Sequence, residues 1–99
     1  MLTQKDILDR LKDQKTFLRE KFYVTEIGLF GSFVRNEAEE SSDIDLLVEI
    51  DAPIEIYKKT KESLHRYLKK LFGKNIDLAN PNSLKPHYKE RILKQAIYA

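Results

Sequence analysis

A glycine–serine pair, Gly31-Ser32, is followed after ten residues by two aspartates, Asp43 and Asp45, that stand two positions apart. Glycine lets an anion approach the backbone closely, and a turn that opens a helix presents N–H groups to phosphate. Paired carboxylates supply the oxygen ligands that Mg²⁺ prefers, and Mg²⁺ is commonly held by one or two of them together with substrate phosphates. The spacing therefore indicates phosphate chemistry, and nucleotidyl transfer in particular.

Each half of this pattern also has a purely structural interpretation. Gly-Ser is a common turn, and Asp-x-Asp is common on the wet face of an edge strand. In a strand, Asp43 and Asp45 share one face, roughly 6.5–7 Å apart along the chain. The other face carries Ile44, Leu46 and Val48 and is strongly apolar. A strand with one apolar face and two acids at one end of the other favours a functional site over a merely wet surface.

Two more charged residues are candidates for the same site. Asp77 lies in a short apolar run, and if that run forms a strand beside residues 43–50, its carboxylate can join the metal pair and act as general base. A solvent-facing position on a strand is the simpler alternative for Asp77. Arg35 could add a fixed positive charge beside bound phosphates, but pairing with Glu37 or Glu39 at the surface is an equally good interpretation.

Hydrophobic periodicity predicts the elements that must position these residues. Helices are expected over residues 3–22, 32–38, 54–72 and from Pro86 through Ile97, and strands over 24–30, 43–50 and 75–79. Thr3 followed by Asp6 predicts the first helix cap, and Gly73 predicts the end of the long third helix. The alternation α-β-α-β-α-β-α implies an α/β (α+β) fold, with a small mixed sheet of three or slightly more strands packed with helices.

Composition places limits on the partners. With 99 residues, 34% charged and 41% hydrophobic, the chain fits a single domain over residues 1–99 with no separate lobe for an acceptor. It lacks cysteine, a signal core and any apolar run of about 18 residues, so we expect a cytoplasmic protein rather than a membrane protein. A net charge of +2 gives no indication of a nucleic-acid template, and the basic residues between Lys58 and Lys74 are predicted to form a solvated helix face.

The motif resembles a known signature. Phe-Gly-Ser at 30–32, followed after ten residues by Asp-Ile-Asp-Leu at 43–46, looks like the pattern of the DNA polymerase beta-like nucleotidyltransferase superfamily. The whole chain, including its segment 83–98, is similar to the minimal nucleotidyltransferases, the MNT antitoxins that are usually encoded beside a HEPN ribonuclease toxin. Many relatives have glycine where this chain has Asn36, a mild departure because asparagine also tolerates left-handed turns.

This resemblance implies a mixed sheet with strands in sequential order, and transfer of AMP from ATP with release of pyrophosphate. It implies that Gly31 and Ser32 hold the triphosphate, and that Asp43, Asp45 and Asp77 are catalytic residues that bind Mg²⁺, with two ions expected. It further implies that the acceptor is a tyrosine of the HEPN toxin, which is thereby silenced.

Two alternatives stay open. The chain could neutralise a toxin by binding alone, with its acidic residues inherited but idle. It could also transfer a nucleotide to a small molecule such as an aminoglycoside, although a homodimer would then have to build the acceptor pocket. A homodimer or a hetero-oligomer with the toxin is compatible with a domain of this size.

Overall fold

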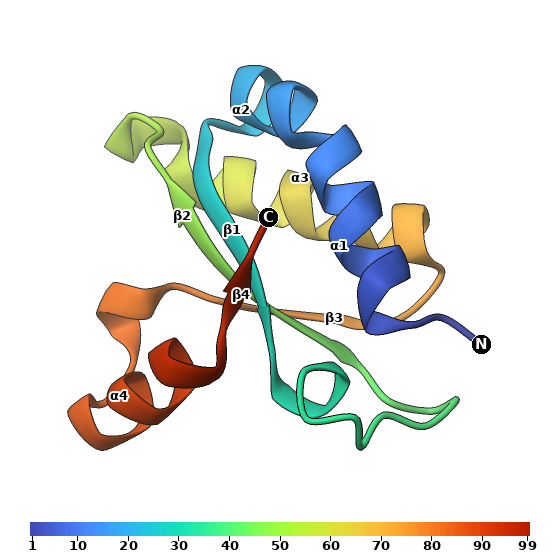
Figure 1. Cartoon of the computed structure of the whole chain (residues 1–99). Helices are drawn as coiled ribbons and strands as arrows, with labels where there is room; N and C mark the ends of the chain where they lie inside the picture. The colour runs from blue at the N-terminus through green and yellow to red at the C-terminus, as the bar shows by residue number, and fades with distance from the viewer.

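The computed structural model describes residues 1–99 and shows a four-stranded mixed sheet with helices on both sides (Figure 1). The elements, in chain order, are α1 (Gln4–Asp13), α2 (Lys15–Phe22), β1 (Val24–Phe30), the 3₁₀ turn η1 (Gly31–Phe33), β2 (Ile44–Ile50), α3 (Ile54–Phe72), β3 (Ile76–Ala79), the 3₁₀ turn η2 (Pro81–Ser83), α4 (Pro86–Gln95) and β4 (Ile97–Tyr98). The predicted fold class is confirmed.

The sheet has the strand order β3-β2-β1-β4. β1 runs antiparallel to both β2 and β4, whereas β2 and β3 are parallel and are joined by the crossover helix α3. The first three strands are therefore sequential neighbours, as the resemblance implied, and β4 adds an edge that the periodicity did not indicate.

One hydrophobic core lies between the sheet and the helices α1, α2 and α3, which cover the same face (Figure 1). The apolar face predicted for β2 is buried there, since Ile44 and Leu46 are fully buried and Val48 nearly so. The second face of β2 is also closed beyond its acids, because Leu47 is fully buried and η2 packs against this strand. Asp45 and Glu49, which flank Leu47 on that face, stay half-buried.

The helix expected over residues 3–22 is in fact two helices, and the prediction of a single one was wrong. Thr3 and Asp6 form the predicted reciprocal cap of α1, but Gln14 ends α1 and begins α2. The Gln14 side chain accepts a hydrogen bond from the hydroxyl of Tyr67 on α3. This break turns α2 away from the axis of α1 (Figure 1) and lets both helices bury their apolar residues against one curved sheet.

The helix expected over residues 32–38 was also wrong, because only one 3₁₀ turn forms. Gly31 and Asn36 both have positive φ, of 78° and 58°, and two left-handed residues so close together interrupt an α-helix. The expectation that Asn36 tolerates a left-handed turn is confirmed. The segment is therefore a tight loop, which holds its backbone closely around Gly31.

The last helix ends two residues earlier than predicted. Ala96 is extended, and Ile97 and Tyr98 pair with Leu29 and Gly28 as β4 rather than continuing the apolar side of α4. The free edge of β1 offers backbone partners that local periodicity cannot reveal. No helix of this structure has both the length and the apolar character needed to cross a membrane.

Candidate active site

The site is assembled around Asp45, which lies in the middle of three neighbouring strands. Asp45 is paired with Phe30 of β1 on one side and with Asp77 of β3 on the other. The sequence prediction that the strand of Asp77 lies beside the strand of Asp45 is therefore confirmed. Gly31 follows Phe30 directly, so the glycine turn and both acids meet at one end of the sheet.

Gly31 and Asp45 are in direct contact. A Cβ atom on Gly31 would lie 2.1 Å from Oδ2 of Asp45, far inside van der Waals contact. The φ angle of Gly31, 78°, is also in the region that residues with a side chain rarely adopt. Glycine is therefore required here for two reasons, since it permits the turn and leaves room for the carboxylate.

The surroundings of Asp45 disfavour its negative charge, and a bound cation would offset this effect. Burial raises the pKa of Asp45 above its ordinary value, and the negative charges of Asp77 and Asp43 raise the pKa further, while Arg35 opposes them. Asp45 is half-buried, whereas Asp43 and Asp77 are exposed. The charges of Asp77 and Asp43 thus both reach Asp45, the central acid of the site.

The structure does not draw the three carboxylates together into a metal-binding set. No group of three or more His, Asp or Glu side chains is arranged to hold a metal ion. The oxygen-only donors nevertheless fit Mg²⁺, and the exposed Asp43 and Asp77 can rotate without repacking the core. The metal-binding roles of these acids stay predictions.

The glycine turn is held by the last turn of α4. The Gly31 N–H donates a hydrogen bond of 2.8 Å to Oε1 of Gln95, and Arg35 Nη1 lies 3.4 Å from the same oxygen. Arg35 also pairs with Glu37 at 3.0 Å, so its surface interpretation is confirmed. Its charge also opposes the rise in the pKa of Asp45, and its role beside bound phosphates stays a prediction.

Sequence reasoning missed Gln95 and two further residues that hold the loops of the site. Gln4 on α1 donates to the carbonyl oxygens of residues 33–34, at 3.3 and 3.4 Å. Lys74 donates to the carbonyl oxygens of Glu40 and Ser42, in the loop that leads to Asp43. A polar residue on an amphipathic helix gives no sequence signal for such contacts, because the loops come from distant parts of the chain.

The fold and this acidic site define a class of nucleotide-handling enzymes, and comparison with known proteins agrees. A family model described as nucleotidyltransferase domain matches residues 11–99. The chain therefore belongs to the nucleotidyltransferase family and is a nucleotidyltransferase. The Protein adenylyltransferase MntA of Thermococcus cleftensis is 41% identical to it over 98 residues, which cover 99% of this chain and 97% of the relative. A Methanocaldococcus jannaschii protein, assigned as a protein adenylyltransferase, is 38% identical over 99 residues, or 99% of each chain.

Solved structures show the same fold. A structure assigned as a minimal nucleotidyltransferase superposes with a TM-score of 0.76 at 26% identity, covering 97% of this chain and 95% of the other. A toxin–antitoxin structure with AMP-PNP superposes with a TM-score of 0.68 at 20% identity, covering 88% of this chain and 69% of the other.

Proposed function

We propose that this chain is a Mg²⁺-dependent adenylyltransferase that transfers AMP from ATP to a tyrosine of a HEPN ribonuclease toxin and so acts as its antitoxin. The observation that carries the proposal is the register Phe30–Asp45–Asp77 across three strands, with Gly31 against the Asp45 carboxylate. Relatives covering the whole chain are named protein adenylyltransferases, which supports a protein as the acceptor.

Two further observations support the proposal that the acceptor is a toxin. The fold recurs in a toxin–antitoxin structure with AMP-PNP, a non-hydrolysable ATP analogue, which supports a toxin as the partner and an adenine nucleotide as the substrate. The described residues 1–99 are built around one core, which favours an acceptor that brings its own binding surface. A protein partner meets that requirement better than a small molecule does.

Each site residue has a proposed role. Gly31 and Ser32 hold the triphosphate at the turn, and Arg35 adds positive charge beside it. Asp43, Asp45 and Asp77 would hold up to two Mg²⁺ ions, which supply charge neutralisation for the entering and leaving oxygens. The raised pKa of Asp45 is consistent with this role, because a cation would offset the repulsion from Asp77 and Asp43.

The proposed reaction is an in-line displacement at the α-phosphorus of ATP. The tyrosine hydroxyl oxygen forms a bond to this phosphorus while the bond to the α,β-bridging oxygen breaks, and pyrophosphate leaves with that electron pair. Asp77 accepts the hydroxyl proton and later releases it to water. The products are AMP-tyrosine on the toxin and free pyrophosphate.

The test uses α-labelled ATP, Mg²⁺ and the HEPN ribonuclease toxin that we expect to be encoded beside this chain. We expect label on that protein, loss of label when its candidate tyrosine is changed to Phe, and no label from γ-labelled ATP. Absence of α-label at saturating ATP and Mg²⁺ would refute the proposal.

The double variant Asp43→Asn with Asp45→Asn separates enzymatic from binding-only neutralisation. We expect it to form the complex with the toxin but to leave the ribonuclease active. A variant that still neutralises the toxin would show that contact alone is sufficient. Complex formation is measured by co-purification, and toxin activity by RNA cleavage.

A further inference from the structure

The strand order fixes the side from which an acceptor can enter. The phosphate turn at Gly31 and the proposed base Asp77 lie on opposite sides of Asp45, because β1 and β3 flank β2. An in-line displacement requires the attacking oxygen to come from the side opposite the leaving pyrophosphate. If the proposed function holds, the acceptor hydroxyl must therefore arrive over the β3 edge of the sheet.

A groove of about 550 Å³ runs along this edge, between α3 and β3. Its α3 wall consists of Lys58, Lys61, Glu62, His65 and Arg66, and its floor is the segment 76–78. Asp77 lines that floor at the edge of the sheet. Its register partner is Asp45, so its side chain belongs to the face opposite Ile76 and α3, and an acceptor seated in the groove reaches the proposed base over this edge. Nothing in the reaction itself requires the other lining residues.

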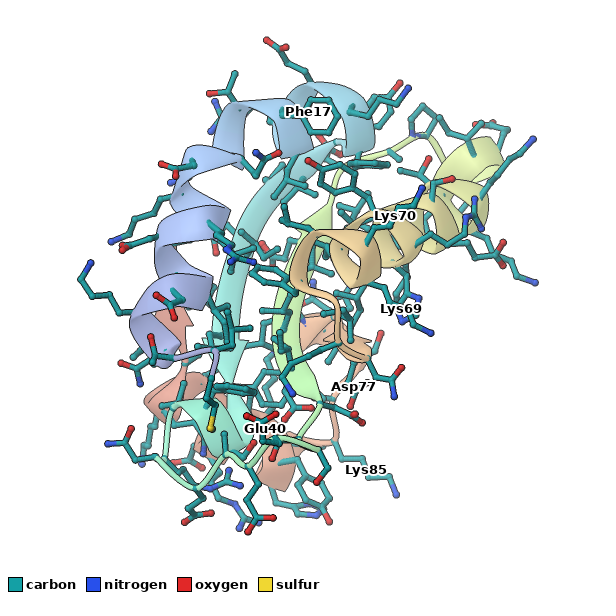
Figure 2. The ribbon with its side chains drawn as sticks, turned by 90° about the vertical axis from the view of Figure 1, so that its right-hand side faces the viewer. Phe17, Glu40, Lys69, Lys70, Asp77 and Lys85 are labelled. Carbon is teal, nitrogen blue, oxygen red and sulfur yellow. The ribbon has the colours of Figure 1, made fainter.

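The cations of this groove have no ionic partner within the chain. The only ion pairs in the structure are Lys5–Asp9, Arg35–Glu37 and Lys94–Glu90, so none of them involves α3. Figure 2 shows Asp77 at the edge of the sheet, with Lys69 and Lys70 along α3 on one side and Lys85 on the other. Cationic side chains without an ionic partner thus flank Asp77, and the figure also shows Glu40 near it.

The lining favours an acidic polypeptide over a nucleic acid. Nucleic acids held without sequence preference stack their bases on aromatic side chains, and no aromatic ring other than His65 lines the groove. Nε2 of His65 is already engaged at 2.7 Å with the carbonyl oxygen of Ile76. Glu62 and Asp77 also interrupt the basic lining, and the net charge of the chain is only +2. The hydrogen bond between His65 and Ile76 also occupies one backbone carbonyl of β3. We therefore expect the side chains of the groove, and not the backbone of β3, to bind the partner.

We infer that the α3–β3 groove is the docking site of the acceptor protein and that it binds an acidic segment close to the acceptor tyrosine. This inference rests on the proposed function and deepens it, because it assigns the recognition of the toxin to residues outside the nucleotide site. Charge complementarity of this kind sets encounter rate and specificity, and salt weakens it.

The experiment compares two triple charge reversals that change the net charge equally. The groove variant carries Lys58→Glu, Lys61→Glu and Arg66→Glu. The matched control carries Lys12→Glu, Lys15→Glu and Arg19→Glu, whose wild-type side chains are exposed on α1 and α2 and lie outside every ion pair. Both are assayed with α-labelled ATP, Mg²⁺ and the neighbour-encoded toxin.

In the groove variant, we expect the KM for the toxin to rise about tenfold or more, while the KM for ATP stays within about twofold of wild type. The control should resemble wild type in both constants. A neutral version with Gln at the same three groove positions should give an intermediate KM for the toxin. The Gln variant adds no negative charge to the groove. It can therefore replace the charge-reversal variant in the assay if the latter is unfolded at the assay temperature.

Equal KM values for the toxin in the groove variant and the control would overturn the inference and leave the proposed function standing. Wild-type protein that does not label the toxin would overturn both. Label that appears on added RNA, and is lost in the groove variant, would replace the acidic segment with a nucleic acid and so refute the inference.

Discussion

At the scale of single residues, Gly31 and Gly73 form a natural comparison. Both have positive φ, of 78° and 65°, and each directly follows the last residue of a regular element, β1 or α3. A Cβ on Gly31 would collide with the Asp45 carboxylate, whereas a Cβ on Gly73 would meet nothing within 4 Å. Substitution by alanine at Gly73 therefore tests backbone strain alone. At Gly31 it tests backbone strain together with displacement of the Asp45 carboxylate.

We expect Gly31→Ala to lower the rate of AMP transfer by about 100-fold or more, because shifting a reacting group by about 1 Å has effects of this size. Gly73→Ala should destabilise the fold by about 1 kcal/mol through its left-handed backbone and leave the rate nearly unchanged. Single-turnover rates and thermal melts of both variants measure this. Equal loss of activity in the two variants would contradict the role assigned to the Gly31–Asp45 contact.

We predict that the charged Asp45 side chain lowers the free energy of unfolding, although the proposed activity requires it. Its pKa is raised by burial and by Asp77 and Asp43, so its charged form is disfavoured in the folded state. This penalty begins as the pH rises past the ordinary value of 3.8 and is complete above the raised pKa. Below that window the carboxyl is neutral in both states and the penalty vanishes.

Asp45→Asn should therefore melt a few degrees higher than wild type at pH 7, on the order of 2–4 °C, while losing transfer activity. The difference in Tm should shrink toward pH 3. Excess Mg²⁺ should raise the Tm of wild type more than that of the variant, since only wild type keeps the central carboxylate. A variant that melts lower than wild type at pH 7 would show that Asp45 stabilises the fold instead.

At the scale of elements, α4 is attached to the site by one side chain. α4 has no fully buried residue, but Gln95 at its end accepts hydrogen bonds from the Gly31 N–H and from Arg35. The β4 strand that follows anchors the helix to β1. A weakly packed helix thus positions the turn that is proposed to hold the triphosphate.

Gln95→Met keeps the size of the side chain and removes the acceptor. We expect the KM for ATP to rise about fivefold, which corresponds to one hydrogen bond of about 1 kcal/mol, with little change in kcat. Lys94→Met on the same turn is the control, because its exposed pair with Glu90 contributes little. A lower KM in Gln95→Met would mean that Gln95 competes with the triphosphate for the Gly31 N–H.

At the scale of the whole molecule, one core joins elements from most of the chain. Its fifteen buried residues come from α1, α2, β1, η1, β2, α3 and β3. The Phe17, Phe22 and Tyr67 rings add an aromatic cluster that links α2 to α3. If one of these elements detached, the apolar residues of the others would become exposed to water.

We therefore expect residues 1–99 to unfold as a single cooperative domain. Urea transitions followed by far-UV circular dichroism and by tyrosine fluorescence should coincide, with an m-value of about 1 kcal/mol/M. The chain has five tyrosines and no tryptophan, so tyrosine reports on the tertiary structure. Two separated transitions would show that the helical layer and the sheet are independent units.

Several features were predictable because their signals are local. The apolar alternation of β2 identified its buried face, Thr3 and Asp6 identified the cap of α1, and Gly73 identified the end of α3. The spacing of Gly31 and Asp45 indicated their common neighbourhood, because two consecutive strands that pair antiparallel bring the end of the first beside the start of the second. These signals depend on periodicity and backbone preference, which the chain carries in its own order.

Other features were decided only when distant segments met. The break at Gln14 comes with a hydrogen bond to Tyr67 of α3, and β4 exists because β1 has a free edge. Gln95 lies 64 positions from Gly31, whose N–H donates a hydrogen bond to it. The sequence by itself thus determined which residues can do chemistry, since residue type and local spacing set that. Only the tertiary structure decided that Asp77 stands beside Asp45 and that basic side chains frame its approach, because strand order and helix placement result from packing of the whole core.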